Sequence, residues 1–221
     1  MLHSPQSTPN AVTYLETGVV PLTYEIHKRQ LNFLHHILTL EAHDPVRKMY
    51  EQLLKYPYEP NWSNEIWSLR RKYELQQTDE EITKMKRKSW KRRVKTTIHN
   101  FVLEELNGQV KNLKKCNLPA YPKLAVQQYL LCLQPHQARA IFKIRTGVVD
   151  LKAVRHYQYE DTVCRLCNGH DEDIEHVVNT CPEITRTHTI NNILTNDIKD
   201  LQEIASRYSE FTSKLNELIS A

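Results

Sequence analysis

The sequence has little glycine and no long hydrophobic run, and each of these features excludes certain classes of protein. Only 4 of its 221 residues are glycine, so a β-barrel with glycine turns and a glycine-rich phosphate-binding loop both lack their usual residues. The longest apolar runs, such as Tyr129 to Leu133, are far shorter than the roughly 18 residues that a membrane span needs. The first residues lack the basic start and apolar stretch of a secretory signal peptide. We therefore expect a soluble intracellular protein, nuclear or cytoplasmic, with no membrane partner.

The charge of the chain is small in total but unevenly distributed. There are 30 basic and 26 acidic residues, a net charge of +4. Between Arg70 and Lys95 there are eleven basic and four acidic residues, whereas between Tyr159 and Glu183 there are one basic and seven acidic residues. These local charges of +7 and −6 indicate that the two regions do different things.

Apolar residues recur at helical spacing along most of the chain, which predicts an all-α fold, a helical bundle with a small CCHC zinc-knuckle insert. Asp44 before Pro45 and the capping box of Thr78 and Glu81 are typical helix starts. The long helix that this box opens is expected to close at Asn107-Gly108. The other expected helices cover residues 22–41, 45–56, 63–75, 122–133, 135–146 and the polar stretch after 182. The expected domains are a disordered lead-in (1–14), a helical region with a basic helix (15–150), the zinc knuckle (151–185) and C-terminal helices (186–221).

The insert contains a C-x2-C-x8-H-x4-C array formed by Cys164, Cys167, His176 and Cys181. Two thiolates separated by two residues can bind zinc from one turn. A helix capped by Asp171 or Asp173 would present the second pair of ligands, His176 and Cys181. Five cysteines without a secretory signal argue against a disulfide framework. The array therefore predicts one zinc ion.

The histidine is the least certain ligand, because His170 offers a competing position and His188 a more distant one. Cys116 and Cys132 have no partner at metal spacing and are expected to be ordinary thiols. Four ligands without an open position, and without a deaminase-like His-x-Glu, indicate a closed structural site. The acidic residues of the loop would repel phosphate, so we do not expect the knuckle itself to be the main contact with nucleic acid.

A block of basic residues without any acid precedes this insert in the long helix. Eight of the twelve residues from 84 to 95 are basic: Lys84, Lys86, Arg87, Lys88, Lys91, Arg92, Arg93 and Lys95. Trp90 and Val94 would anchor one side of the helix. Such a concentration of positive charge favours contact with a nucleic-acid backbone, because each neutralised phosphate releases counterions. A solvated helix face or a nuclear-targeting patch is the alternative.

Two stretches resemble the region that follows the reverse-transcriptase domain in non-LTR (LINE-type) retrotransposon polyproteins of animals. The first comprises residues 16–22 (ETGVVPL) and 28–38 (KRQLNFLHHIL). The second comprises 142–147 (FKIRTG), the Cys-x2-Cys and residues 175–182 (EHVVNTCP). They occur in the expected order, and the resemblance runs from about residue 15 to 183.

The resemblance implies a nucleic-acid-binding C-terminal region that contacts template RNA or target DNA. It makes the four residues of the array zinc ligands and places Arg145 at the matching helix end, among the nucleic-acid contacts. No Tyr-x-Asp-Asp motif of a polymerase is present, and the endonuclease is missing too. We therefore expect no enzymatic activity and no small-molecule substrate. The alternatives are a zinc-containing adaptor that binds a protein partner through its C-terminal helices, and a retrotransposon remnant without function.

Overall fold

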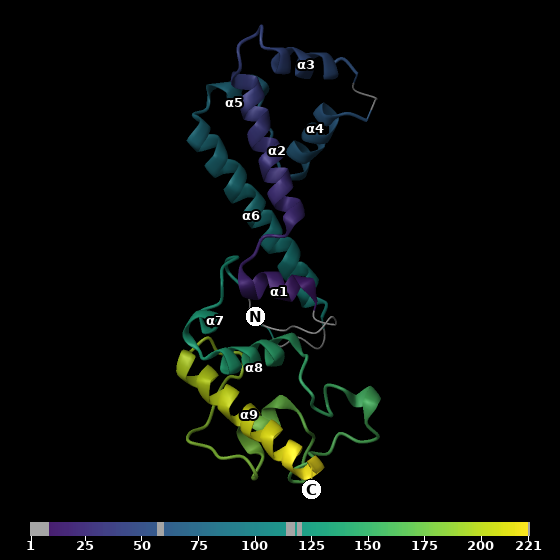
Figure 1. Cartoon of the computed structure of the whole chain (residues 1–221), viewed down its shortest axis with the longest axis vertical. Coiled ribbons are helices and arrows are strands. Elements are labelled where there is room, and N and C mark those ends of the chain that lie inside the picture. Colours follow the sequence, from purple (N-terminus) through teal and green to yellow (C-terminus); the bar gives the residue numbers. More distant parts are fainter. Residues whose placement is uncertain (1–8, 57–59, 114–117, 119–120, 221) are drawn as a thin grey trace. The chain divides into compact units, whose positions relative to one another are not determined.

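The computed structural model describes residues 9–56, 60–113, 118 and 121–220, and Figure 1 shows their course. The chain divides into two compact units: unit 1 comprises Met1–Val19 and Leu106–Ala221, and unit 2 comprises Val20–Glu105. The described residues are mostly helical and form no β-strand, only two isolated bridges, which confirms the predicted all-α class. No helix in the described part of the chain is long and apolar enough to span a membrane.

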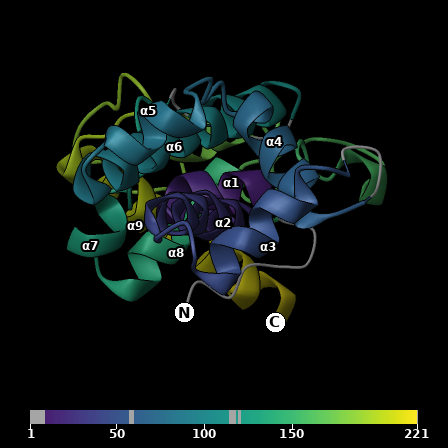
Figure 2. The same ribbon diagram turned by 90° about the horizontal axis from the view of Figure 1, so that it is seen from above.

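Unit 2 is built around one long helix, α2, with the other helices arranged around it (Figure 2). The elements are α2 (Leu22–Thr39), α3 (Pro45–Leu53), α4 (Trp62–Lys72), α5 (Asp79–Lys84) and the first part of α6 (Arg87–Lys111). The predicted helix starts are confirmed: the Asp44 side chain accepts from the Val46 N–H, and Thr78 and Glu81 form the capping box. Trp90 is fully buried and donates its indole N–H to the Leu31 carbonyl at 3.0 Å, which attaches α6 to α2.

The helix predicted from Thr78 to Asn107-Gly108 begins where expected, but it is interrupted at Met85 and ends later than predicted. Met85 is extended, with φ −76° and ψ 138°, and separates α5 from α6. The imidazole Nε2 of the buried His35 lies 2.9 Å from the Met85 carbonyl oxygen, which the break has freed. At the other end α6 continues through Gly108 to Lys111, because an isolated glycine costs a helix only about 1 kcal/mol.

Unit 1 contains the C-terminal half of the chain and the helix that precedes α2. Its elements are α1 (Asn10–Thr17), the end of α6, α7 (Tyr129–Cys132), α8 (Pro135–Thr146), η1 (His156–Gln158), η2 (His176–Thr180) and α9 (Ile198–Ser220). Helices α8 and α9 pack against each other, and their core also contains Cys164 and Cys181. The segment 151–185 therefore shares one core with α8 and α9, and the boundaries predicted at residues 150 and 185 do not coincide with those of the two units.

Other predicted boundaries in unit 1 also need correction. Residues 10–14 belong to α1 rather than to a disordered lead-in, and residues 1–8 lie outside the described part. Of the helix predicted over 122–133 only α7 forms, because Val126 makes an antiparallel bridge to Thr17 instead. Gly18 has φ +67°, and a Cβ there would lie 2.4 Å from the Ala125 carbonyl carbon, so this approach of the two segments requires glycine.

A single helix, α9, follows residue 182, after an irregular stretch from 183 to 197. Its apolar face, which includes Ile204, Tyr208 and Phe211, is buried within unit 1. Packing within unit 1 therefore buries most of the apolar residues that a protein partner would contact in the adaptor alternative.

Candidate functional site

The two cysteines of the Cys-x2-Cys lie in a short hairpin. Val163 forms an antiparallel bridge with Asp171, and the Cys164 N–H donates to the His170 carbonyl at 2.8 Å. Asn168 turns the chain with φ 54°, a left-handed conformation that asparagine tolerates better than most residues. The hairpin therefore holds the thiols of Cys164 and Cys167 in one turn.

The other two residues of the array lie at the ends of one helical turn. The Asp173 side chain accepts from the His176 N–H at 2.7 Å. Of the two predicted capping residues, Asp171 and Asp173, it is therefore Asp173 that caps this helix. The chain then forms η2, a π-helical turn, and the Cys181 N–H donates to the His176 carbonyl at 2.8 Å. The wider spacing in sequence thus becomes a short distance in space.

The ligand atoms of all four residues lie within 4.8 Å of one another. Nε2 of His176 is 3.2 Å from Sγ of Cys167, while the other imidazole nitrogen lies 2.9 Å from the Thr180 hydroxyl, which fixes the orientation of the ring. Cys164 and Cys181 are completely buried. This group of three thiols and one imidazole could hold a metal ion.

The competing residues do not join this group. His170 is exposed, and its ring centroid lies 5.5 Å from that of His176. His188 faces Asp200, with Nε2 3.4 Å from the carboxylate. Cys132 is exposed on α7, and Cys116 lies outside the described residues. Among the described candidates the structure therefore favours His176 as the fourth ligand.

The electrostatics of the cluster suit a cation. Burial raises the pKa of the Cys181 thiol to about 12 and also raises the pKa of Cys164. At Cys167, burial is outweighed by hydrogen bonds from the backbone N–H groups of Gly169 and His170 and from neighbouring thiols, so its pKa is lowered. Buried thiols with raised pKa values remain protonated unless a positive charge lies beside them, and a bound metal ion would supply that charge.

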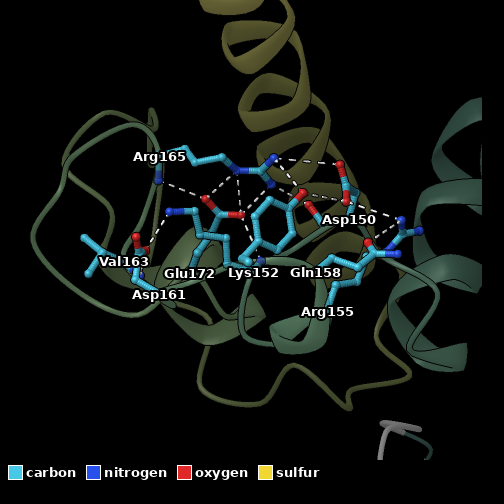
Figure 3. Close-up of polar contacts among 9 residues, drawn as sticks. Asp150, Lys152, Arg155, Gln158, Asp161, Val163, Arg165 and Glu172 are labelled. Atoms are coloured by element: carbon cyan, nitrogen blue, oxygen red, sulfur yellow. Dashed lines mark hydrogen bonds and ion pairs between the residues drawn. The ribbon is translucent and has the colours of Figure 1, made fainter.

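The hairpin is stabilised by an ion pair that the sequence pattern did not reveal (Figure 3). Glu172 is completely buried, and its carboxylate accepts from the Arg165 guanidinium, from the Arg165 backbone N–H at 2.9 Å and from the Lys152 backbone N–H at 3.1 Å. Arg165 also donates to the Asp150 carbonyl at 2.8 Å and lies over the Tyr159 ring. The signal in the sequence was that Arg165 is the one basic residue among seven acids.

The remaining acids of the loop also have structural roles. Asp171 accepts from the Thr162 hydroxyl, and Glu175 accepts from the Asn179 amide at 2.8 Å. The acidic residues between Cys167 and His176 are therefore part of the scaffold of the cluster.

The predicted basic residues Lys84, Lys86, Arg87, Lys88, Lys91, Arg92, Arg93 and Lys95 are all exposed. On the opposite side of the helix Trp90 and Val94 are completely buried, as predicted. Lys84 lies 4.0 Å from Glu80, and the other seven form no ion pair with the described residues. We call these eight residues the basic block.

Arg145 was predicted to contact nucleic acid, but the structure buries its side chain inside unit 1. It lies in the last turn of α8, as expected, but its side chain is only 2% exposed. Its guanidinium donates to the Thr195 carbonyl at 2.8 Å and to the Asn196 side chain at 2.9 Å, and lies 3.4 Å from the buried Glu16 carboxylate. Both terminal nitrogens of the guanidinium therefore form hydrogen bonds inside unit 1.

Comparison of the chain with protein-family models, curated proteins and solved structures finds no match.

Proposed function

We propose that Cys164, Cys167, His176 and Cys181 bind one structural Zn²⁺. A tetrahedral ion with Zn–S bonds of about 2.3 Å separates its sulfur ligands by about 3.8 Å, which fits within the 4.8 Å spread of the four ligand atoms. Thiolates and imidazole suit zinc, and four protein ligands leave no position for a reactive water. The ion would connect the hairpin to η2.

We further propose that the chain is a non-catalytic nucleic-acid-binding module derived from a non-LTR retrotransposon polyprotein, and that the basic block binds RNA or DNA. The observation that carries this proposal is the exposure of eight neighbouring basic side chains, seven of them without a carboxylate partner among the described residues. Unit 2 holds 16 basic and 12 acidic residues, so the entire net charge of +4 belongs to it. Phosphate contacts require positive charge of this kind.

The position of the basic block at the start of α6 supports a role in binding: Lys84 ends α5, Lys86 lies between the two helices, and the other six residues lie in α6. The first turn of α6 contains basic residues and no acid, whereas the positive end of a helix dipole favours acids there. Arg87 and Lys88, in the first turn of α6, therefore oppose the stability of this helix. The block also adds to the positive potential of the helix N-terminus, which by itself favours anions.

The test compares two triple variants that remove the same charge. Lys91→Gln, Arg92→Gln and Arg93→Gln neutralise the block, while Arg29→Gln, Lys48→Gln and Lys55→Gln neutralise exposed residues elsewhere in unit 2. Binding of labelled RNA and duplex DNA is measured over a series of salt concentrations. We expect the first variant to reduce the slope of log K against log salt by about 2 to 3, because each lost phosphate contact removes about 0.7 to 0.9.

The control variant should change this slope much less. Equal effects of the two variants would contradict a specific role for the block. Absence of binding by the wild-type chain at low salt, where electrostatic affinity is highest, would overturn the proposal and favour the protein-binding adaptor.

A further inference from the structure

Trp67 on α4 is the most exposed of the three tryptophans, all of which lie in unit 2. Trp90 is buried, and Trp62 contacts the rings of Phe33 and Tyr50 with centroid distances of 5.7 and 5.9 Å. Trp67, in contrast, is 56% exposed. A single exposed apolar side chain is common on protein surfaces, so the surroundings of Trp67 decide whether it marks a binding site.

A cationic side chain lies directly over this exposed ring. Arg71 follows Trp67 by one helical turn, and its guanidinium carbon is 4.7 Å from the centroid of the indole. The neighbouring Arg70 is held by Asp79 at 2.7 Å. Arg71, however, forms no ion pair with the described residues, so its charge is available to a ligand.

The two side chains border a shallow hollow. It is lined by Trp67, Arg70, Arg71, Leu75 and Gln76 and has a volume of about 270 Å³. Pockets for complete small-molecule ligands usually have volumes of about 300–1,000 Å³. At about 270 Å³ the hollow lies just below this range, and it has room for one flat ring.

We propose that Trp67 and Arg71 form a stacking site for a base of a single-stranded nucleic acid. This inference depends on the proposed function, because unit 2 also carries the basic block that would bind the backbone of the same strand. A flat ring can stack on the indole, and the guanidinium adds a cation for the ring or for its phosphate. Bases in a duplex are already stacked on their neighbours and would not reach the site.

The experiment uses the full chain and two labelled probes, a short oligouridine strand and an RNA duplex. Trp67→Ala should weaken binding of the single strand by about tenfold, since stacking of one base accounts for a loss of this size. Binding of the duplex, and the slope of log K against log salt, should stay unchanged because no phosphate contact is lost. Trp67→Phe should keep most of the affinity because it retains an aromatic face.

Tyr56→Ala is the matched control, since Tyr56 is an aromatic residue of unit 2 with 54% exposure. If the wild-type chain binds both probes with the expected salt dependence and Trp67→Ala behaves like Tyr56→Ala, the stacking site is refuted and the proposed function stands. An equal loss on the two probes would also refute it, because that result indicates a structural defect. If the wild-type chain binds neither probe, the proposed function fails and the stacking site fails with it.

Discussion

Replacement of Arg165 by methionine should destabilise the hairpin of the metal cluster without unfolding unit 2. The change removes the guanidinium from the completely buried Glu172 but leaves the carboxylate its hydrogen bonds from two backbone N–H groups. Methionine is unbranched and preserves part of the packing of the arginine stem.

The magnitude follows from the burial of the two partners. Loss of one partner from a buried ion pair typically costs about 3 to 5 kcal/mol, but the Arg165 side chain is 20% exposed, so solvent reduces the effect. We expect about 2 kcal/mol for Arg165→Met and about 1 kcal/mol for Glu172→Gln, which removes the charge but keeps one accepting oxygen. The double variant should cost about 1 kcal/mol less than the sum of the two, because the second change removes the uncompensated carboxylate.

Hydrogen exchange of the backbone amides in residues 162–172 measures this effect locally. A loss of about 2 kcal/mol should accelerate exchange by about 30-fold in Arg165→Met. All three tryptophans lie in unit 2, so the unfolding transition followed by tryptophan fluorescence should remain in place. Exchange accelerated less than about threefold, or additive effects in the double variant, would refute the coupling of Arg165 to Glu172.

Two further predictions concern the rest of unit 1. Elemental analysis should find about one zinc per chain. A Cys164→Ser, Cys167→Ser variant should lose the metal and the protection of residues 151–190 from hydrogen exchange, whereas Cys132→Ser should retain both. A wild-type chain purified without zinc would contradict the assignment. Arg145→Met should destabilise unit 1 by about 3 kcal/mol, because Glu16 would remain buried without its cation. The same variant should leave nucleic-acid affinity unchanged, and a substantial loss of affinity in a folded variant would show that Arg145 contacts the ligand after all.

Features of the fold that depend on neighbouring residues were predictable from the sequence. The Asp44 cap and the capping box of Thr78 and Glu81 are confirmed because each involves groups two or three positions apart. The break at Met85 was not predictable, since the group that meets its carbonyl is His35, fifty positions earlier. A bridge between distant segments likewise replaced the helix that was expected before α7.

The same distinction applies to the site. The four residues of the metal cluster lie within 18 positions, and their spacing alone predicted that they converge. The role of Arg145 depends on Glu16, 129 positions away, and on Asn196. Charge and helix position were visible in the sequence, but the burial of the Arg145 side chain was not.

The contrast between three largely buried arginines of unit 1 and the basic block of unit 2 gives a criterion for the binding surface. Arg145, Arg165 and Arg207 in unit 1 all lie beside a carboxylate and have side chains at most 20% exposed. The charge of each arginine is therefore neutralised by its neighbouring carboxylate, and its largely buried guanidinium is poorly placed to bind a phosphate. The residues of the basic block have the same kind of charge but are exposed. A basic side chain supports nucleic-acid binding only if it is both exposed and without a carboxylate partner, and seven adjacent members of the block meet both conditions among the described residues.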